Sequence, residues 1–336
     1  MGKYDKMGFF GGGWDGHSWK ATNAFFGEIM AAAGFEVLYF DGTKEFANEG
    51  LLGGLDVVVK NITMADSPEM TQKQIDLLAH LQEQKLLTAD QVEEQTAFVE
   101  SGGNSSQKGY TWTHPQMNGY NAYILKGGKG VSIHGGGNDD GRGSLVLAGL
   151  NGSIWLRHSG ASKPGWEPGI KVKIVNPDHQ ANEGVSDMEF RNIWSLDHEL
   201  YATHGNAGSG PGDELYTCLT MEGMTVLAKV EYGPHEPEHL QGLNQPYVTI
   251  NIVGDKGGSV ATTMTGHSIG SYTSWNAPID AARQTAQLIL FQADAKPEQI
   301  RDAIDALPEI IERYRPKDIA EADSRTLPPQ FANFMK

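Results

Sequence analysis

The chain contains a single cysteine, Cys218, which excludes an internal disulfide bond and any metal site built only from cysteines. Basic residues are also scarce, with 26 Lys and Arg against 42 Asp and Glu and a formal net charge of −16. A phosphate backbone repels so acidic a chain, and we therefore expect no nucleic-acid partner. No apolar run reaches the ~20 residues that span a bilayer. The first residues also lack the apolar core of a secretory signal. The expectation is a cytoplasmic protein with no membrane partner.

Several well-known site motifs are missing as well. There is no G-x-x-x-x-G-K-[ST] phosphate loop, and the glycines at 11–13 do not form a dinucleotide fingerprint with a following acidic residue. No G-x-S-x-G elbow follows a strand pattern. We expect no nucleotide cofactor, although the turn at 11–13 leaves a flavodoxin-like nucleotide binder open as an alternative. Cys218 lies outside any strand–turn–helix elbow, which favours a buried small residue over a nucleophile.

Glycine is abundant, with 42 residues clustered at 8–16, 102–109, 127–143 and 205–212. No fixed period links these clusters, so they are interpreted as loops at strand ends and not as a repeat array.

Short apolar runs alternate with segments of helical spacing. Strands are expected at 7–10, 35–40, 55–59, 131–133, 172–175, 226–230, 247–252 and 259–264. Helices are expected at 18–33, 68–84, 88–101, 144–155, 277–292 and 297–314. This order predicts an α/β fold, namely a flavodoxin-like, doubly wound, mostly parallel sheet with helices on both faces.

The predicted organisation is one α/β domain at 1–295 with a large inserted segment at about 66–123. Residues 102–123 are interpreted as a polar and aromatic inserted loop. A C-terminal helix and tail at 296–336 are expected to pack on the domain or on a neighbouring subunit, which leaves a homo-oligomer open.

The most informative stretch is Tyr123–Asn138, YILKGGKGVSIHGGGN. Its pattern predicts a helix end, a glycine turn, a short buried strand and then His134 at a second glycine-rich turn. Ligands of open parallel sheets bind at the carboxyl ends of the strands, so His134 is expected where the chemistry takes place. The alternative is a structural, half-buried histidine beside a tight turn.

Three more histidines follow predicted elements: His17, His158 and His267. Parallel strands bring their carboxyl ends to one edge, and a neutral imidazole suits both proton transfer and a divalent metal. His17, His134 and His267 are therefore the predicted ligands of a zinc or manganese ion. Acidic-Leu-Tyr motifs at 197–201 and 213–216 each supply a carboxylate candidate, the alternative being a solvated acidic turn.

The order of these motifs resembles the ThuA-like (trehalose utilisation) family of the class I glutamine amidotransferase-like superfamily. The matching pieces span about 17–290 and are the His17 turn, GKGVSIHGG, LNGSIWLRH, VKIVNPDHQANEGVSD, the acidic-Leu-Tyr motif and GDKGGSVATTMTGH. The resemblance implies that His134 replaces the amidotransferase cysteine, so glutaminase activity is not expected. It also implies a role in carbohydrate metabolism and a metal ion near the equivalent histidines. His179 departs from the family pattern because Gln180, and not proline, follows it.

Together these features predict an enzyme that acts on a keto or otherwise modified sugar by histidine acid–base chemistry, with or without a metal. An isomerase, a lyase or hydratase, and a hydrolase all fit. The predicted catalytic residues are His134, Glu199 and Tyr201, preferred over the 213–216 motif for their distance from His179. The predicted substrate-binding residues are Trp14, His158, Tyr272 and Trp275. The alternative is a non-catalytic sugar-binding or assembly module on an old enzyme fold.

Overall fold

The computed structural model describes residues 4–13, 18–63, 68–100, 112–134, 136–137, 144–158, 170–190, 213, 216–231, 244–267, 269–273 and 277–315. Their centre is a nine-stranded sheet in the order β2-β1-β3-β4-β11-β10-β9-β6-β7. Its strands are β1 (Lys6–Gly13), β2 (Glu36–Asp41), β3 (Val57–Thr63), β4 (Lys129–Ile133), β6 (Ile170–Ile174), β7 (Met188–Phe190), β9 (Thr225–Glu231), β10 (Asn244–Val253) and β11 (Gly258–Thr263). β5 (Ser153–His158) and β8 (Tyr216–Thr220) pair separately as an antiparallel ribbon.

The sheet confirms the predicted α/β class. β2, β1, β3, β4 and β11 run parallel to one another. From β11 to β7 each strand is antiparallel to the next. The parallel half brings the carboxyl ends of β1, β3, β4 and β11 to one edge, which is the edge where the sequence places the histidines.

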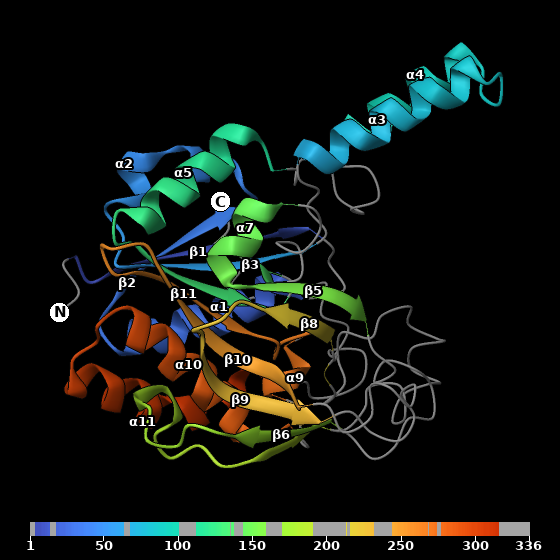
Figure 1. Ribbon diagram of the computed structural model, residues 1–336. Helices are drawn as coiled ribbons and strands as arrows, with labels where there is room; N and C mark the ends of the chain where they lie inside the picture. The colour runs from blue at the N-terminus through green and yellow to red at the C-terminus, as the bar shows by residue number, and fades with distance from the viewer. Residues whose placement is uncertain are drawn as a thin grey trace.

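Helices cover both faces of the sheet, as predicted (Figure 1). One face carries α1 (Trp19–Ala32), α10 (Ile279–Gln292) and α11 (Pro297–Tyr314). The other carries η2 (Lys44–Ala47), α2 (Glu49–Leu52), α5 (His114–Leu125) and α7 (Leu145–Asn151). Alternate residues of β3 serve the two cores, since Val57 and Val59 pack with the first group and Val58 with the second.

Two short helices contact α10. η4 (Gln180–Asn182) contacts α10, and α9 (Gly270–Thr273) precedes α10 in the chain. None of the described helices combines the length and the apolar character needed to cross a bilayer.

The prediction of a glycine turn at 11–13 is wrong, because β1 continues to Gly13 with its last seven residues buried. A Cβ on Gly11 would lie 2.3 Å from Cε3 of Trp19, so glycine here lets α1 approach the strand closely.

The interpretation of 102–123 as a loop is wrong for its second half, while residues 101–111 lie outside the described ranges. Thr113 caps α5 in a capping box, in which its N–H donates to Gln116 Oε1 at 2.9 Å. Trp112 and Tyr120 of this segment are fully buried against Phe46, so α5 is part of the second core.

The helix expected at 144–155 is too long. α7 ends where Gly152 adopts φ +72°, and the chain then enters β5 at Ser153. A glycine in this left-handed conformation is a common helix stop, so the chain changes direction here.

The expected helices at 68–84 and 88–101 are confirmed as α3 (Pro68–Glu83) and α4 (Ala89–Glu100). The capping box of Thr88 and Gln91 is also confirmed, with donor–acceptor distances of 2.9 and 3.3 Å. The two helices pack on each other and project from the body (Figure 1). No side chain between residues 71 and 97 is buried, and Leu77 and Leu86 are 56% and 69% exposed. The hairpin thus contributes no residue in this range to either core.

Candidate functional site

His134 occupies the carboxyl end of β4, as the sequence predicted. Its N–H donates to the Thr263 carbonyl at 2.9 Å, and its own carbonyl accepts from Gly137 N at 2.8 Å. The backbone of His134 adopts φ +39°, which is uncommon for a residue other than glycine. Such backbone strain gathers at functional sites, and here it accompanies a fully buried imidazole.

A hydrogen bond fixes the orientation of the His134 ring. Nδ1 lies 2.6 Å from the carbonyl oxygen of Met264. Because a carbonyl oxygen only accepts, Nδ1 carries the proton, and the lone pair of the neutral ring is then on Nε2. Nε2 is therefore the atom of His134 that can take up a proton or bind a metal.

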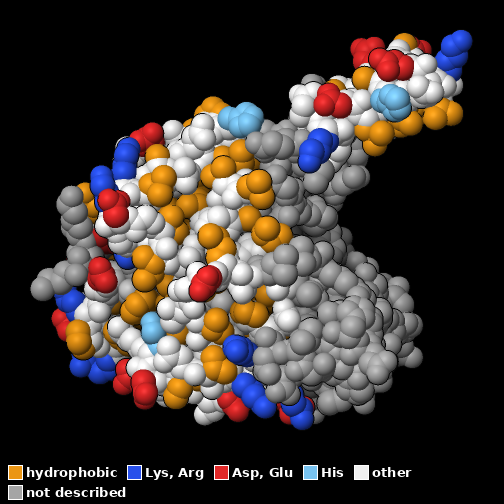
Figure 2. Space-filling view, in the orientation of Figure 1, with side chains coloured by type: hydrophobic (Ala, Val, Ile, Leu, Met, Phe, Trp, Pro, Cys, Tyr) orange, Lys and Arg blue, Asp and Glu red, His pale blue; other side chains and the backbone are white. Residues whose placement is uncertain are grey.

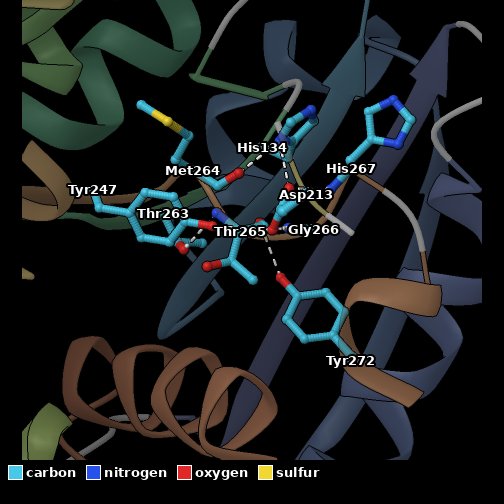
Figure 3. A network of polar contacts seen from close by, with 9 residues as sticks. All are labelled: His134, Asp213, Tyr247, Thr263, Met264, Thr265, Gly266, His267 and Tyr272. Atoms are coloured by element: carbon cyan, nitrogen blue, oxygen red, sulfur yellow. Dashed lines mark hydrogen bonds and ion pairs between the residues drawn. The ribbon is translucent and has the colours of Figure 1, made fainter. Parts of the chain in front are cut away.

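Asp213 also lies near Nδ1 of His134 and is fully buried. Its Oδ2 accepts hydrogen bonds from Tyr247 Oη at 3.1 Å and from Gly266 N at 3.0 Å, while Oδ1 accepts from His267 N at 3.3 Å (Figure 3). Oδ1 also lies 3.9 Å from Nδ1 of His134, too far for a hydrogen bond but close for an ionic interaction. The carboxylate is thus placed to stabilise a positive charge on His134.

Two buried tyrosines support this arrangement. Burial, together with the nearby Asp213, raises the pKa of Tyr247 well above its usual value, so its hydroxyl keeps the proton that it donates to Asp213. Tyr272 donates to the Thr265 carbonyl at 3.0 Å, and burial likewise raises the pKa of its hydroxyl. Figure 3 shows the Tyr272 ring beneath the 263–267 segment, away from the two imidazole rings.

The structure places Tyr272, which was predicted to stack on a sugar ring, among aromatic core residues. Its side chain is 1% exposed, and it packs against the rings of Phe25 and Phe26 at centroid distances of 6.1 and 4.8 Å. Tyr272 thus belongs to the first core, and its bond to the Thr265 carbonyl holds the segment after β11.

The predicted convergence of His134 and His267 is confirmed. Their ring centroids are 5.4 Å apart, the ring planes meet at 82°, and His267 is 1% exposed. The other predicted residues do not enter this description: His17, Trp14, Glu199, Tyr201 and Trp275 lie outside the described residues. His158 is the last residue of β5, opposite Tyr216 in the ribbon, and so lies off the main sheet.

The described residues do not by themselves fit the predicted metal ion. They form no group of three or more potential ligands from His, Cys, Asp and Glu. His134 and His267 supply imidazoles, but both oxygens of Asp213 already accept hydrogen bonds from neighbouring donors. A third ligand from the described residues is lacking, and we derive no step through a metal.

The sequence analysis ranks Asp213 second and does not single out Lys60, whose side chain is buried in the second core. The spelling of the 213–216 motif, which is the closer to the family pattern, was the available signal for Asp213. Lys60 of β3 is 1% exposed, with Nζ 5.8 and 5.6 Å from the ring centroids of Trp112 and Tyr120. The available sequence signal for its burial is a lysine within the apolar strand pattern VVVKNIT.

Comparison with known proteins gave likeness in structure only. No family model and no curated protein sequence matches the chain. A ThuA-like protein from Bacteroides uniformis is 13% identical over 86% of this chain and 90% of its own, with a TM-score of 0.48. A ThuA-like protein from Parabacteroides merdae is 13% identical over 86% and 88%, with a TM-score of 0.46. A cytoplasmic protein from Salmonella typhimurium is 14% identical over 84% and 98%, with a TM-score of 0.45.

The family name of the first two structures agrees with the resemblance found in the sequence.

Proposed function

We propose that this protein is an enzyme in which His134 transfers a proton to or from a carbohydrate substrate. The observation that carries the proposal is the Nδ1 contact of His134 with the Met264 carbonyl, beside the buried carboxylate of Asp213. Together they fix one tautomer with its lone pair on Nε2 and place a carboxylate beside the imidazolium that proton transfer would form, which is the arrangement of a general base. The strained backbone at His134 adds support, because the fold maintains this position at a cost.

The proposed step is short. Nε2 of His134 accepts a proton from a substrate C–H or O–H group, and Asp213 stabilises the imidazolium that forms. Tyr247, Gly266 and His267 donate hydrogen bonds to Asp213. These bonds hold the carboxylate in place during the step and stabilise its negative charge. His267, at 5.4 Å between ring centroids, is positioned to polarise a substrate oxygen or return the proton.

The substrate class rests on the sequence resemblance, which suggests a sugar oxidised at a ring carbon to a ketone. A ketone makes the neighbouring C–H acidic, and proton removal there begins an isomerisation or an elimination. Hydrolysis of such a keto-glycoside can start in the same way. Acid–base chemistry at a single histidine thus covers the three reaction types that the sequence left open.

The test is exchange of the proton next to the ketone. A 3-keto disaccharide is incubated in D₂O with the protein, and NMR follows loss of the α-proton signal and any new product. His134→Asn is the informative variant, since asparagine tolerates positive φ but is not a base. General acid–base catalysis contributes about 10²–10⁴-fold, and a loss of this size is expected. His80→Gln, an exposed histidine on α3, is the matched control and should retain full activity.

Equal exchange by wild type and His134→Asn would remove His134 from the reaction. Saturable binding of the keto sugar with neither exchange nor product would instead indicate the sugar-binding module. A metal at His17, His134 and His267 remains a separate proposal. Elemental analysis tests it, since a stoichiometric ion in the wild type should be lost in His134→Ala.

A further inference from the structure

Ser18 precedes the first residue of α1, and it departs from the usual behaviour of a serine in that place. A serine at a helix start normally has an extended backbone, and its hydroxyl accepts from an N–H of the first turn. Ser18 instead adopts φ +41° and ψ +35°, and its hydroxyl caps no N–H of the described helix 19–32. This left-handed conformation is costly for a residue with a Cβ. The hydroxyl of Ser18 therefore serves a contact other than the helix cap.

That contact joins Ser18 to Ile269, which is 251 residues away along the chain. The Ile269 N–H donates to Ser18 Oγ at 2.8 Å, and both residues are buried, with exposed fractions of 2% and 6%. Away from water a hydrogen bond is stronger, and removal of the acceptor leaves a buried donor unsatisfied. The bond thus ties the start of α1 to the segment after β11.

Ile269 lies two residues after His267, on a segment whose ends are bonded to each other. The Ile269 carbonyl accepts from the N–H groups of Tyr272 and Thr273 at 3.0 and 3.1 Å, and from Thr273 Oγ1 at 3.0 Å. Tyr272 Oη in turn donates to the Thr265 carbonyl at 3.0 Å. Because these bonds connect the two ends of the segment, a contact at Ile269 acts on the position of His267.

His267 is held from both sides along the chain. Asp213 accepts from Gly266 N at 3.0 Å and from His267 N at 3.3 Å, so it fixes the chain up to His267. Ser18 fixes the chain beyond it. One anchor alone would let the His267 side chain swing about the backbone, whereas two anchors fix its direction. The ring then stays beside His134, with 5.4 Å between the ring centroids (Figure 3).

We propose that Ser18 is a positioning residue, whose hydroxyl holds the imidazole of His267 in place beside His134. The left-handed backbone places this hydroxyl against Ile269 and not over the first turn of α1. The consequence for catalysis rests on the proposed function, in which His267 polarises a substrate oxygen or returns the proton. The placement of His267 does not rest on it.

Histidine NMR tests the placement without substrate. In the full chain with ¹³C,¹⁵N-labelled histidine, the rings of His134 and His267 are close enough for a nuclear Overhauser effect between their protons. Ser18→Gly removes the acceptor and relieves the positive φ, and this effect should be lost. Ser18→Thr keeps the hydroxyl but puts a β-branched residue in a left-handed position, so the effect should persist although the variant is less stable.

The matched control is Thr273→Val, which removes one of the three donors that the structure describes at the Ile269 carbonyl. Two backbone donors remain there, and the bond from Ile269 N to Ser18 is untouched. The Overhauser effect between the two rings should therefore be the same as in the wild type.

The exchange assay with the 3-keto disaccharide gives the functional readout. Ser18→Gly should lower the exchange rate about tenfold, the equivalent of one hydrogen bond. Ser18→Thr should lower the Tm without lowering the rate. A rate that follows the Tm in both variants would assign Ser18 a structural role only and would overturn the proposal.

The remaining outcomes separate this proposal from the proposed function. An unchanged Overhauser effect in Ser18→Gly overturns the positioning role, whatever the rate. Absence of exchange in the wild type refutes the proposed function, and the effect in Ser18→Gly then decides on the placement alone. If neither Ser18 variant folds, hydrogen exchange of the wild type decides, because the Ile269 amide should be strongly protected. Fast exchange of that amide overturns its bond to Ser18.

Discussion

Replacement of Asp213 by asparagine probes the centre of the site, since the two side chains have the same shape. In the wild type four groups of the described residues present donors to the carboxylate: Tyr247 Oη, Gly266 N, His267 N and, at 3.9 Å, His134 Nδ1. The amide oxygen of the introduced asparagine can take the place of Oδ2 and keep the bonds from Tyr247 and Gly266. Its NH₂ group then faces His267 N and His134 Nδ1, and donor opposes donor.

The expected cost follows from these contacts. A hydrogen bond to a charged group contributes about 1.5–3 kcal/mol, and a buried donor left without a partner costs about 1–3 kcal/mol. The free energy of unfolding should therefore fall by about 2–5 kcal/mol. An unfolding entropy of about 2.1 cal/mol/K per residue over the 336 residues converts this to a fall in Tm of roughly 3–7 °C.

Urea unfolding at pH 7 measures the change, with circular dichroism for Tm. The matched control is Asp280→Asn, because Asp280 accepts one backbone hydrogen bond, from Ser186 N at 3.0 Å, that an asparagine oxygen can keep. The control should shift stability by less than about 0.5 kcal/mol, as surface changes usually do. A loss in Asp213→Asn no larger than in the control would refute the buried donor network and, with it, the role given to Asp213 beside His134.

Three further predictions concern other parts of the chain. Burial lowers the pKa of His179, and Nδ1 of the neutral ring accepts the Ala181 N–H at 3.2 Å. The neutral side chain therefore stabilises the folded protein above the unfolded-state pKa of about 6.5, and this stabilisation is lost as pH falls through the lower folded pKa. Wild type should therefore lose more stability between pH 7 and 5 than His179→Asn, which keeps the cap; equal losses in urea titrations would contradict this. Burial raises the pKa of Cys218 to about 12, so iodoacetamide at pH 8 should modify the native chain slowly and one thiol after unfolding, and mass spectrometry would expose fast native labelling as a contradiction. Gly136→Ala places a Cβ 2.4 Å from the Lys60 carbonyl and should lower the free energy of unfolding by about 1–3 kcal/mol. Gly149→Ala, at a helical position with open space around it, should raise the free energy of unfolding by about 0.5–1 kcal/mol. Thermal unfolding measures both, and a stability change of the same sign in the two variants would contradict the prediction.

The sequence predicted the parts of the fold that depend on neighbours along the chain. The strand before His134, the helices α1, α10 and α11 and the capped helix α4 all follow from apolar spacing and terminal residues. The same local signals are present for α5, in Thr113 and Gln116, but the polar and aromatic composition of this segment favours a loop. The burial of its aromatic residues depends on Phe46, far away in the sequence, so local spacing alone did not indicate it.

The residues of the site also differ in whether their local sequence predicts their position. His134 and His267 were predicted correctly because each follows a strand, and parallel strands bring their carboxyl ends together. Asp213 could not be ranked in this manner, since its partners are 34, 53 and 54 residues away and belong to β10 and to the segment after β11. The burial of Tyr272 was not predictable for the same reason, because nothing in its local sequence shows that Phe25 and Phe26 pack against its ring.

The sequence by itself determined the α/β class and the position of His134 at a strand end, because backbone propensity and hydrophobic period act over a few residues. The tertiary structure decided which nitrogen of His134 carries the proton and which carboxylate faces it. It also decided which aromatic rings are buried. Figure 2 shows that other hydrophobic side chains remain visible among the polar ones on the described surface. These features depend on the packing of segments that are distant in sequence, such as Asp213 and the segment after β11.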